Sequence, residues 1–274
     1  MNIEPFRIDD IAPFLKLAER ENWLAEPWEF QFLLSTFPQG SFAARSDNGE
    51  TAGFVTSFRH ERSGWIGNLI VAGEQRGRGI GEKLFTAALE TLQAVGADTI
   101  WLTASKSGSP LYQKYGFIGI DTICRRVGEG RGRHASVGLL SGGVALTTSE
   151  AEVDSLAWGD RRSALLAVTV GRGRLLQDGS GFISLQPCGD SVQLGPFSAV
   201  DSGCAERLFE AALQNVASGT KVFIDSPASN RAAVRMLNRK RIKVVGSNLL
   251  MYAGKKPNYR PELIYGLATM GSCG

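Results

Sequence analysis

The sequence predicts an α/β protein with mixed sheets (α+β), built as two tandem domains whose mostly antiparallel central sheets are flanked by helices. Its 274 residues exceed an average domain of about 100 to 200 residues. Strand-like runs and amphipathic helical segments alternate along the chain. The segment EKLFTAAL at 82–89 also recurs as ERLFEAAL at 206–213, an offset of 124 residues. We therefore expect domains at 1–130 and 144–274, joined by a linker at 131–143.

The elements of the first domain follow from its patterning. Helices are expected at 10–22 and 26–37, where apolar residues recur at helical spacing. Strands are expected at 41–45, 51–60 and 64–72, separated by turn residues at 47–49 and 61–64, which predicts an antiparallel meander.

A glycine loop at 75–81 follows the third of these strands. Beyond it we expect a helix at 82–97, a parallel strand at 98–105, a helix at 109–117 that ends at Gly116, and a strand at 117–127. The glycine-rich run 128–143 fits a connection between domains. In the second domain, the helix at 206–213 precedes a strand at 221–226 and a further helix.

Composition excludes several classes of protein. With 43% hydrophobic and 21% charged residues and a mean hydropathy of −0.06, the chain is an ordinary globular protein rather than a disordered, collagen-like or coiled-coil one. No apolar run approaches a membrane span and the N-terminus does not resemble a signal peptide, so we expect a cytoplasmic protein without a membrane partner. A net charge of +3 argues against a nucleic-acid partner, and the basic run 235–243 is interpreted as a solvent-facing helix end.

The ligand supply for a metal is poor. The four cysteines are far apart and form no CxxC pair, and the chain has two histidines. We therefore expect no metal site and free thiols at Cys124, Cys188, Cys204 and Cys273.

The loop QRGRGIG at 75–81 has the chemistry of an anion-binding site. Alternating glycines expose consecutive backbone N–H groups at the positive end of a helix dipole, and two arginines add charge, which favours a diphosphate. A Walker A loop would need Gly-Lys-Ser/Thr at its end, and a dinucleotide loop would need a glycine where Glu82 stands.

With this loop, the strand TIWLTAS and the sequence LYQKYGF in place, residues 1–127 resemble the GNAT superfamily of N-acetyltransferases. Residues 144–270 resemble the second domain of tandem members. The resemblance implies acetyl-CoA as co-substrate, with its pyrophosphate on the loop and its pantetheine arm paired with the backbone of the preceding strand. Ser105 and Ser107 stand where the family often has an asparagine that contacts this arm. The implied coenzyme-binding residues are Leu69, Ile70, Val71, Arg76, Gly77, Arg78, Gly79, Ile80, Gly81, Ser105 and Ser107.

The same resemblance assigns catalysis. Tyr112 of the LYxxxGF pattern would donate a proton to the departing thiolate, as a group with an ordinary pKa of about 10 can do at neutral pH. Many relatives have a glutamate as base where this chain has Asn68, which cannot accept a proton. The base therefore stays open among four side chains on segments that border the acceptor cleft in this family, namely Glu26, Glu29, His60 and Glu61. Ordered water, or an acceptor of low pKa, would make a protein base unnecessary.

The second domain lacks the glycine loop, and its counterpart of Tyr112 is Leu237. We expect it to bind no acetyl-CoA and instead to support the first domain or shape the acceptor pocket. The predicted function is transfer of acetyl from acetyl-CoA to a primary amine, in a small molecule or a peptide, by direct attack. The alternative is a coenzyme-binding sensor without turnover. A monomer is favoured, because duplication within one chain can replace a dimer contact.

Overall fold

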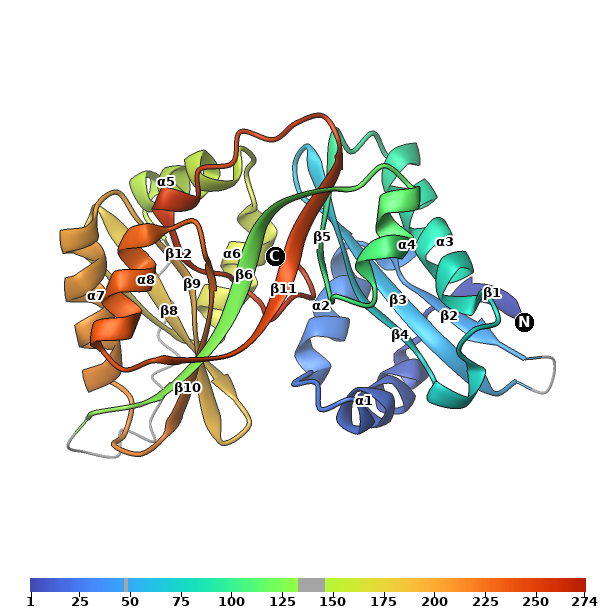
Figure 1. The fold of residues 1–274 in the computed structure, drawn as a ribbon, viewed down its shortest axis with the longest axis horizontal. Coiled ribbons are helices and arrows are strands. Elements are labelled where there is room, and N and C mark those ends of the chain that lie inside the picture. Colours follow the sequence, from blue (N-terminus) through green and yellow to red (C-terminus); the bar gives the residue numbers. More distant parts are fainter. Residues whose placement is uncertain (47–48, 133–145) are drawn as a thin grey trace.

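The computed structural model describes residues 1–46, 49–132 and 146–274, and one mixed sheet runs through all of it. The sheet has twelve strands and is flanked by helices (Figure 1). The predicted α/β class with mixed sheets is therefore confirmed. Within the described residues, no helix is long and apolar enough to cross a membrane.

The predicted elements of the first half are present, and a short edge strand, β1, was not expected. Gly116 ends the last helix with φ +79°, as its position predicted. Residues 47 and 48 of the expected turn lie outside the described residues. The elements are β1 (Asn2–Pro5), α1 (Ile11–Arg20), α2 (Pro27–Thr36), β2 (Phe42–Arg45), β3 (Thr51–Arg59), β4 (Ser63–Val71), α3 (Ile80–Ala94), β5 (Thr99–Ala104), α4 (Ser109–Lys114) and β6 (Ile118–Glu129).

From α5 onward the second half follows the order that the first half follows from α1, so that α7 and α8 correspond to α3 and α4, and it adds one further strand, β12. Of the expected linker, residues 133–143 lie outside the described residues. The elements are α5 (Thr148–Trp158), α6 (Ser163–Gly171), β7 (Arg174–Gln177), β8 (Gly181–Cys188), β9 (Ser191–Ala199), α7 (Ser202–Gln214), β10 (Lys221–Pro227), α8 (Arg231–Arg239), β11 (Lys243–Gly254) and β12 (Ile264–Gly266).

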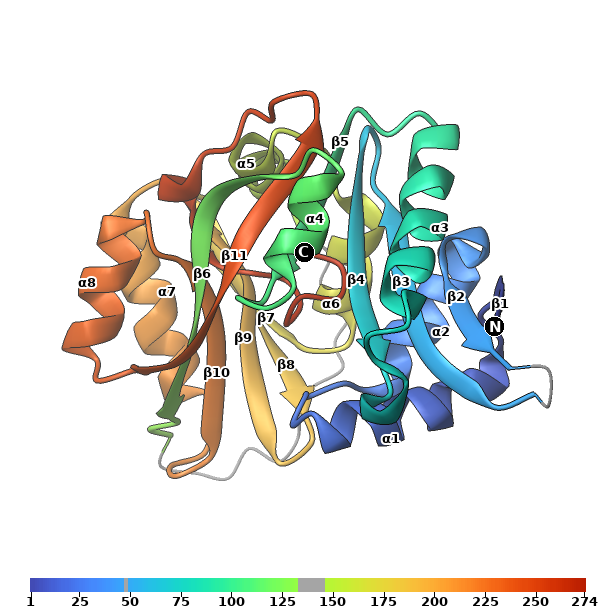
Figure 2. The same cartoon turned by 45° about the vertical axis from the view of Figure 1, so that its right-hand side comes forward.

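Helices cover both faces of the first half of the sheet (Figure 2). Consecutive residues of β3 point to opposite faces, as a strand requires. Phe54 packs with Phe14 of α1, whereas Val55 packs in a cluster with Leu84 and Phe85 of α3. Both faces of β3 are thus buried, which explains why the consecutive residues Ala52 to Val55 lack the alternation of apolar and polar side chains that a half-buried strand shows.

The two halves exchange their last long strands. The order across the sheet is β1-β2-β3-β4-β5-β11-β6-β10-β9-β8-β7. β11 of the second half pairs with β5, and β6 of the first half pairs with β10. β6 and β11 also pair with each other and lie side by side at the centre of the molecule (Figure 1). Each half therefore completes its sheet with a strand from the other.

An aromatic cluster adds to this connection. The ring of Trp158, from α5, lies 6.1 Å from Trp65 in β4 and 5.8 Å from Trp101 in β5. All three indoles are buried. Aromatic side chains of this size contribute large buried areas, so the halves share apolar core as well as backbone hydrogen bonds.

Candidate functional site

A gap opens between β4 and β5. Their parallel ladder joins only Ser63–Trp65 to Thr99–Trp101. Further along β4 a bulge interrupts its pairing with β3: Thr56 faces Gly67 and Phe54 faces Ile70. Two residues of β4 thus oppose one of β3, which bends a strand and increases its twist. The end of β4 is left without a ladder to β5.

Asn68 lies at this bulge with φ +54°. Asparagine tolerates this left-handed conformation better than most residues do. Its amide nitrogen donates to the hydroxyl of Thr56 at 3.1 Å. Asn68 is therefore fitted to the bend of the strand.

The glycine loop forms the other side of the gap. Gly77 and Gly79 have φ of +76° and +75°, and open space lies where a side chain at either position would begin. Gly79 is the N-cap of the 15-residue α3 and has no side chain to cap it. The first N–H groups of α3 are therefore left for a ligand, at the positive end of the helix dipole.

These features border a cavity of about 700 Å³, here called the loop cavity. It brings together nearly all the predicted coenzyme residues with Tyr112. Of the two loop arginines, Arg76 lines it, bonded to the carboxylate of Glu21 at 2.5 Å, whereas Arg78 does not and donates to Gln75 at 3.1 Å. The predicted residues that line it are Leu69, Ile70, Val71, Arg76, Gly77, Gly79, Ile80, Gly81, Ser105, Ser107 and Tyr112.

A second cavity of about 190 Å³, here called the Glu29 cavity, adjoins the first. Tyr112, Leu69 and Ser105 line both, so the tyrosine stands where the two meet. Trp23, 42% exposed, also lines both cavities. The second half of the chain contributes Asn248 of β11 and the segment Met270–Ser272.

Glu29 and Tyr112 are suited to different proton transfers in this setting, because the pKa of Glu29 lies near neutrality and that of Tyr112 well above it. Burial raises the pKa of Glu29 to about 7, and the neighbouring Glu26 adds to the rise, while Ser272 and Arg172 partly offset it. Burial raises the pKa of Tyr112 to about 12, and its ring packs 5.0 Å from that of Phe85. Near neutral pH the carboxylate is poised to accept a proton, and the phenol keeps one to donate.

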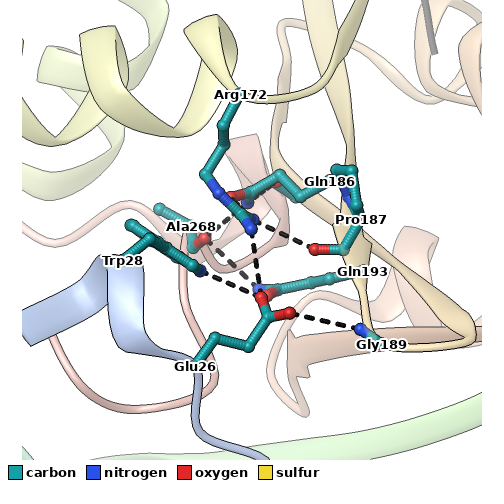
Figure 3. Close-up of polar contacts among 9 residues, drawn as sticks. Glu26, Trp28, Arg172, Gln186, Pro187, Gly189, Gln193 and Ala268 are labelled. Carbon is teal, nitrogen blue, oxygen red and sulfur yellow. Dashed lines mark hydrogen bonds and ion pairs between the residues drawn. The ribbon is translucent and has the colours of Figure 1, made fainter. Parts of the chain in front are cut away.

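Glu26, another of the proposed bases, has a structural role (Figure 3). Its carboxylate accepts from the indole of Trp28 at 3.0 Å, the guanidinium of Arg172 at 3.0 Å and the backbone N–H of Gly189 at 3.2 Å. Arg172 also lies over the Trp28 ring, 4.1 Å from its centre. Glu26 thus ties α2 to the second half of the chain.

His60 and Glu61 lie outside both cavities. Burial, with the charge of Arg162, lowers the pKa of His60 to about 3. Glu61 is exposed. Of the four proposed bases, only Glu29 reaches the site. No cluster of three or more metal-ligating side chains occurs among residues 1–46, 49–132 and 146–274.

The corresponding gap in the second half is filled by the chain itself. β9 and β10 correspond to β4 and β5, and their parallel ladder covers only Val192 and Gln193. β12 pairs with the next part of β9, where Ile264 faces Ser198. On its other side, the N–H of Leu267 donates to the carbonyl of Asp225 in β10 at 2.8 Å. β12 therefore bridges the two strands.

The start of α7, the counterpart of the glycine loop, is also occupied. The carboxylate of Asp201 accepts from the N–H groups of Gly203 at 2.7 Å and Cys204 at 2.9 Å. Leu237, at the position of Tyr112, is fully buried. A negative charge on the helix N-terminus opposes binding of a phosphate there.

The comparisons with known proteins agree with this geometry. Residues 8–117 match the acetyltransferase (GNAT) family, and residues 151–266 match an acetyltransferase (GNAT) domain. The chain is a tandem member of the GNAT acetyltransferase family, and the predicted resemblance is confirmed.

Similar proteins cover most of the chain. A holothin acyltransferase from a Pseudoalteromonas species is 25% identical over 217 residues, which cover 75% of this chain and 72% of that protein. The structure of a putative acetyltransferase from Pyrococcus horikoshii has a TM-score of 0.84 and 25% identity, and covers 100% of this chain and 95% of that one. A GCN5-related N-acetyltransferase from Sphaerobacter thermophilus shares the fold, with a TM-score of 0.65, 15% identity and coverage of 94% and 98%.

Proposed function

We propose that this chain is an acetyl-CoA-dependent N-acetyltransferase whose single active site lies in the first half. The observation that carries the proposal is the meeting of the loop cavity and the Glu29 cavity at Tyr112. One cavity has the size and anion-binding loop suited to a coenzyme, and the other holds a carboxyl group that titrates near neutral pH. In the second half, β12 and Asp201 occupy the corresponding positions.

The residues of the loop cavity suit coenzyme A. The open N–H groups around Gly79 would hold the pyrophosphate, and the unpaired edge of β4 at Leu69–Val71 would hydrogen-bond the amides of the pantetheine arm as an added strand does. When bound, acetyl-CoA supplies an activated acetyl thioester. Ser105 and Ser107 border the same cavity from the turn that follows β5.

Glu29 and Tyr112 would handle the protons of the reaction. Glu29 takes a proton from the acceptor ammonium, directly or through a water molecule, and leaves a neutral amine. The amine nitrogen attacks the thioester carbonyl, so that a C–N bond forms and the C–S bond breaks. The Tyr112 hydroxyl gives its proton to the departing thiolate. The acylated nitrogen then gives up its excess proton, which returns to the tyrosinate, and Glu29 releases its proton to solvent, so that one proton is released for each amine acetylated.

The acceptor would be a small-molecule amine. The Glu29 cavity has a volume of about 190 Å³, which suits a small-molecule amine better than the N-terminal segment of a protein. The relative from Pseudoalteromonas is named for acylating holothin, and it matches three quarters of this chain. A peptide amine is the other acceptor in keeping with the family.

Calorimetric titration of acetyl-CoA tests the coenzyme site. We expect one equivalent to bind, and Gly79→Trp to abolish binding because the new side chain would project into the loop cavity. Gly96→Trp is the matched control, since Gly96 has a similar φ of +73° and also faces open space. Two equivalents per chain, or equal binding by the Gly79 variant, would refute the assignment.

A sensor that binds the coenzyme without turnover is the second candidate, and Asn68 at the usual position of the base favours it. Tyr112→Phe separates the two. For an enzyme, the variant binds acetyl-CoA but acetylates far more slowly. For a sensor, the unaltered protein itself acetylates no member of a broad amine panel while still binding the coenzyme.

A further inference from the structure

We propose that the far end of the acceptor binds in a third cavity, against the paired side chains of Arg125 and Asp225, and that this end is uncharged and carries hydrogen-bonding groups. The inference rests on the proposed function, because it takes the Glu29 cavity as the place of the reacting amine. It adds a subsite built by both halves of the chain and the class of ligand that fits it.

The third cavity, here called the Arg125 cavity, has about 200 Å³. It adjoins the Glu29 cavity, because four residues line both: Thr103, Asn248, Met270 and Gly271. An acceptor with its amine at Glu29 can therefore extend past Asn248 and Met270 toward the ion pair.

The exchange of strands creates this subsite. Arg125 in β6 and Asp225 in β10 are direct cross-strand partners, one from each half of the chain. β11 lies on the other side of β6 and contributes Gly246 and Ser247 next to a register shift in its pairing. If β6 paired within the first half instead, Arg125 would not lie beside Asp225 of β10.

The ion pair leaves the cavity without net charge. The Arg125 guanidinium donates to the two carboxylate oxygens of Asp225 at 2.9 and 2.7 Å, and also to the carbonyl of Met270 at 3.1 Å. Asp225 is 6% exposed and the Arg125 side chain 28%. Apart from this pair, Glu29 is the one charged residue among the described residues that line either of the two adjoining cavities.

This arrangement disfavours a charged far end. A carboxylate on the acceptor would lose its water and lie beside the carboxylate of Asp225, and an ammonium would lie beside the guanidinium of Arg125. Each charge of the pair is already balanced by its partner, so neither incoming charge finds a free counter-charge that would offset its desolvation. An amide or hydroxyl carries no charge to desolvate, and Thr103 and Asn248 offer it hydrogen-bonding groups beside the intact pair.

The pair also ties β6 to β10, and a purely structural role would give it no effect on ligand choice. Three amines that differ only at the far end separate these roles: 4-(2-aminoethyl)benzamide, 4-(2-aminoethyl)benzoate and 4-(2-aminoethyl)benzylamine. Their dissociation constants are measured by calorimetry with protein saturated with coenzyme A. We expect the benzamide to bind about tenfold or more tightly than the other two.

Two variants test the contribution of each charge. Asp225→Asn frees the guanidinium and is expected to shift the preference toward the benzoate. Arg125→Gln frees the carboxylate and is expected to shift it toward the benzylamine. Asp178→Asn is the matched control, because Asp178 pairs with Arg207 at 2.8 Å and lines none of the three cavities.

Equal binding of the three amines by the unaltered protein, or no binding of any of them, overturns the subsite. This part of the test needs no variant, so it does not depend on whether the variants fold. Unchanged preferences in folded variants also overturn it. Turnover with acetyl-CoA is recorded on the same samples. Binding in the expected order without acetylation contradicts the proposed function and supports the subsite. Acetylation of all three amines with equal dissociation constants supports the proposed function and contradicts the subsite.

Discussion

At the scale of single residues, the titratable carboxyl group of the Glu29 cavity comes from Glu29 of α2 and not from position 68 of β4. Asn68 lies in the left-handed region at the bulge of β4, and its side chain is bonded to Thr56. Glu29 projects from α2 into the same space and is 6% exposed. A carboxyl group in such a place keeps its proton to higher pH, which suits it to exchange protons near neutrality.

Replacement of Glu29 by glutamine should remove a pH dependence as well as activity. We expect kcat/KM for an accepted amine to rise with pH up to about 7 and then level, and Glu29→Gln to lower the rate by about 10²- to 10⁴-fold and flatten this rise. A pH–rate series on both proteins measures it. Glu61→Gln, on the exposed surface, should behave as the unaltered protein; a Glu29→Gln variant that keeps the same rise would contradict the assignment.

The same substitution should stabilise the protein in a pH-dependent way. The pKa of Glu29 is about 7 in the folded chain and near 4.5 when unfolded, so between these values the folded state binds more protons. The free energy of unfolding therefore falls as pH rises through this range, by about 3 kcal/mol in all. Urea unfolding at pH 4.5 and pH 8 should show Glu29→Gln gaining stability only at pH 8, and equal effects at both pH values would rule out this cause.

At the scale of elements, the bulge of β4 and the two loop glycines Gly77 and Gly79 shape the site. The first helices, the meander, the glycine loop and the LYxxxGF helix were predictable, because each has a local pattern of apolar spacing or turn residues. Of the loop residues from Arg76 to Gly81, which the motif singled out, all except Arg78 line the loop cavity. Asn248 and Met270 were not, because nothing local in β11 or in the final segment indicates which cavity they reach.

Gly67 shows how closely the final segment packs on β4. A Cβ atom at this position would lie 2.4 Å from the carbonyl oxygen of Ser272 and 2.9 Å from that of Gly271. The indole of Trp65 donates to the same Gly271 carbonyl at 3.1 Å. Backbone atoms, which cannot rotate away, form this contact.

Gly67→Ala should therefore displace the segment Met270–Ser272 and disturb the Glu29 cavity. We expect the KM for an acceptor amine to rise about 10- to 100-fold, as misplacement by about 1 Å can cause, while the dissociation constant of acetyl-CoA stays the same. Steady-state kinetics and calorimetry measure the two values. Gly73→Ala, which faces open space, is the control, and an unchanged KM in the Gly67 variant would argue against a role of this segment in the acceptor site.

At the scale of the whole molecule, the exchange of β6 and β11 joins the two halves. Sequence patterning predicted the strand at 117–127 that becomes β6, but it did not predict β11 or the partners of either strand, because IGIDTICRRV and KVVGSNLLMYAG would fit either sheet. Strand pairing depends on non-local contacts, and the internal repeat favoured two separate sheets. The Arg125–Asp225 pair was missed for the same reason: its two members are 100 residues apart.

The protein should therefore unfold as one unit. Removal of the second half would take β11 from β5 and leave β6 without β10, exposing strand edges on both sides. We expect a single calorimetric transition with equal calorimetric and van't Hoff enthalpies, and no cooperative transition for the fragment 1–130 alone. Two resolved transitions, or a stable fragment, would contradict this expectation.

The exchange also limits how this gene can change. A recombination event that replaced one half by that of a related protein would introduce a foreign β6 or β11. That strand would have to pair with strands of the other half whose sequence had not changed with it. Such a hybrid would have to match in register, in twist and at the Arg125–Asp225 position at once. We therefore expect the two halves to be inherited as a matched pair, with correlated substitutions along β6 and β11.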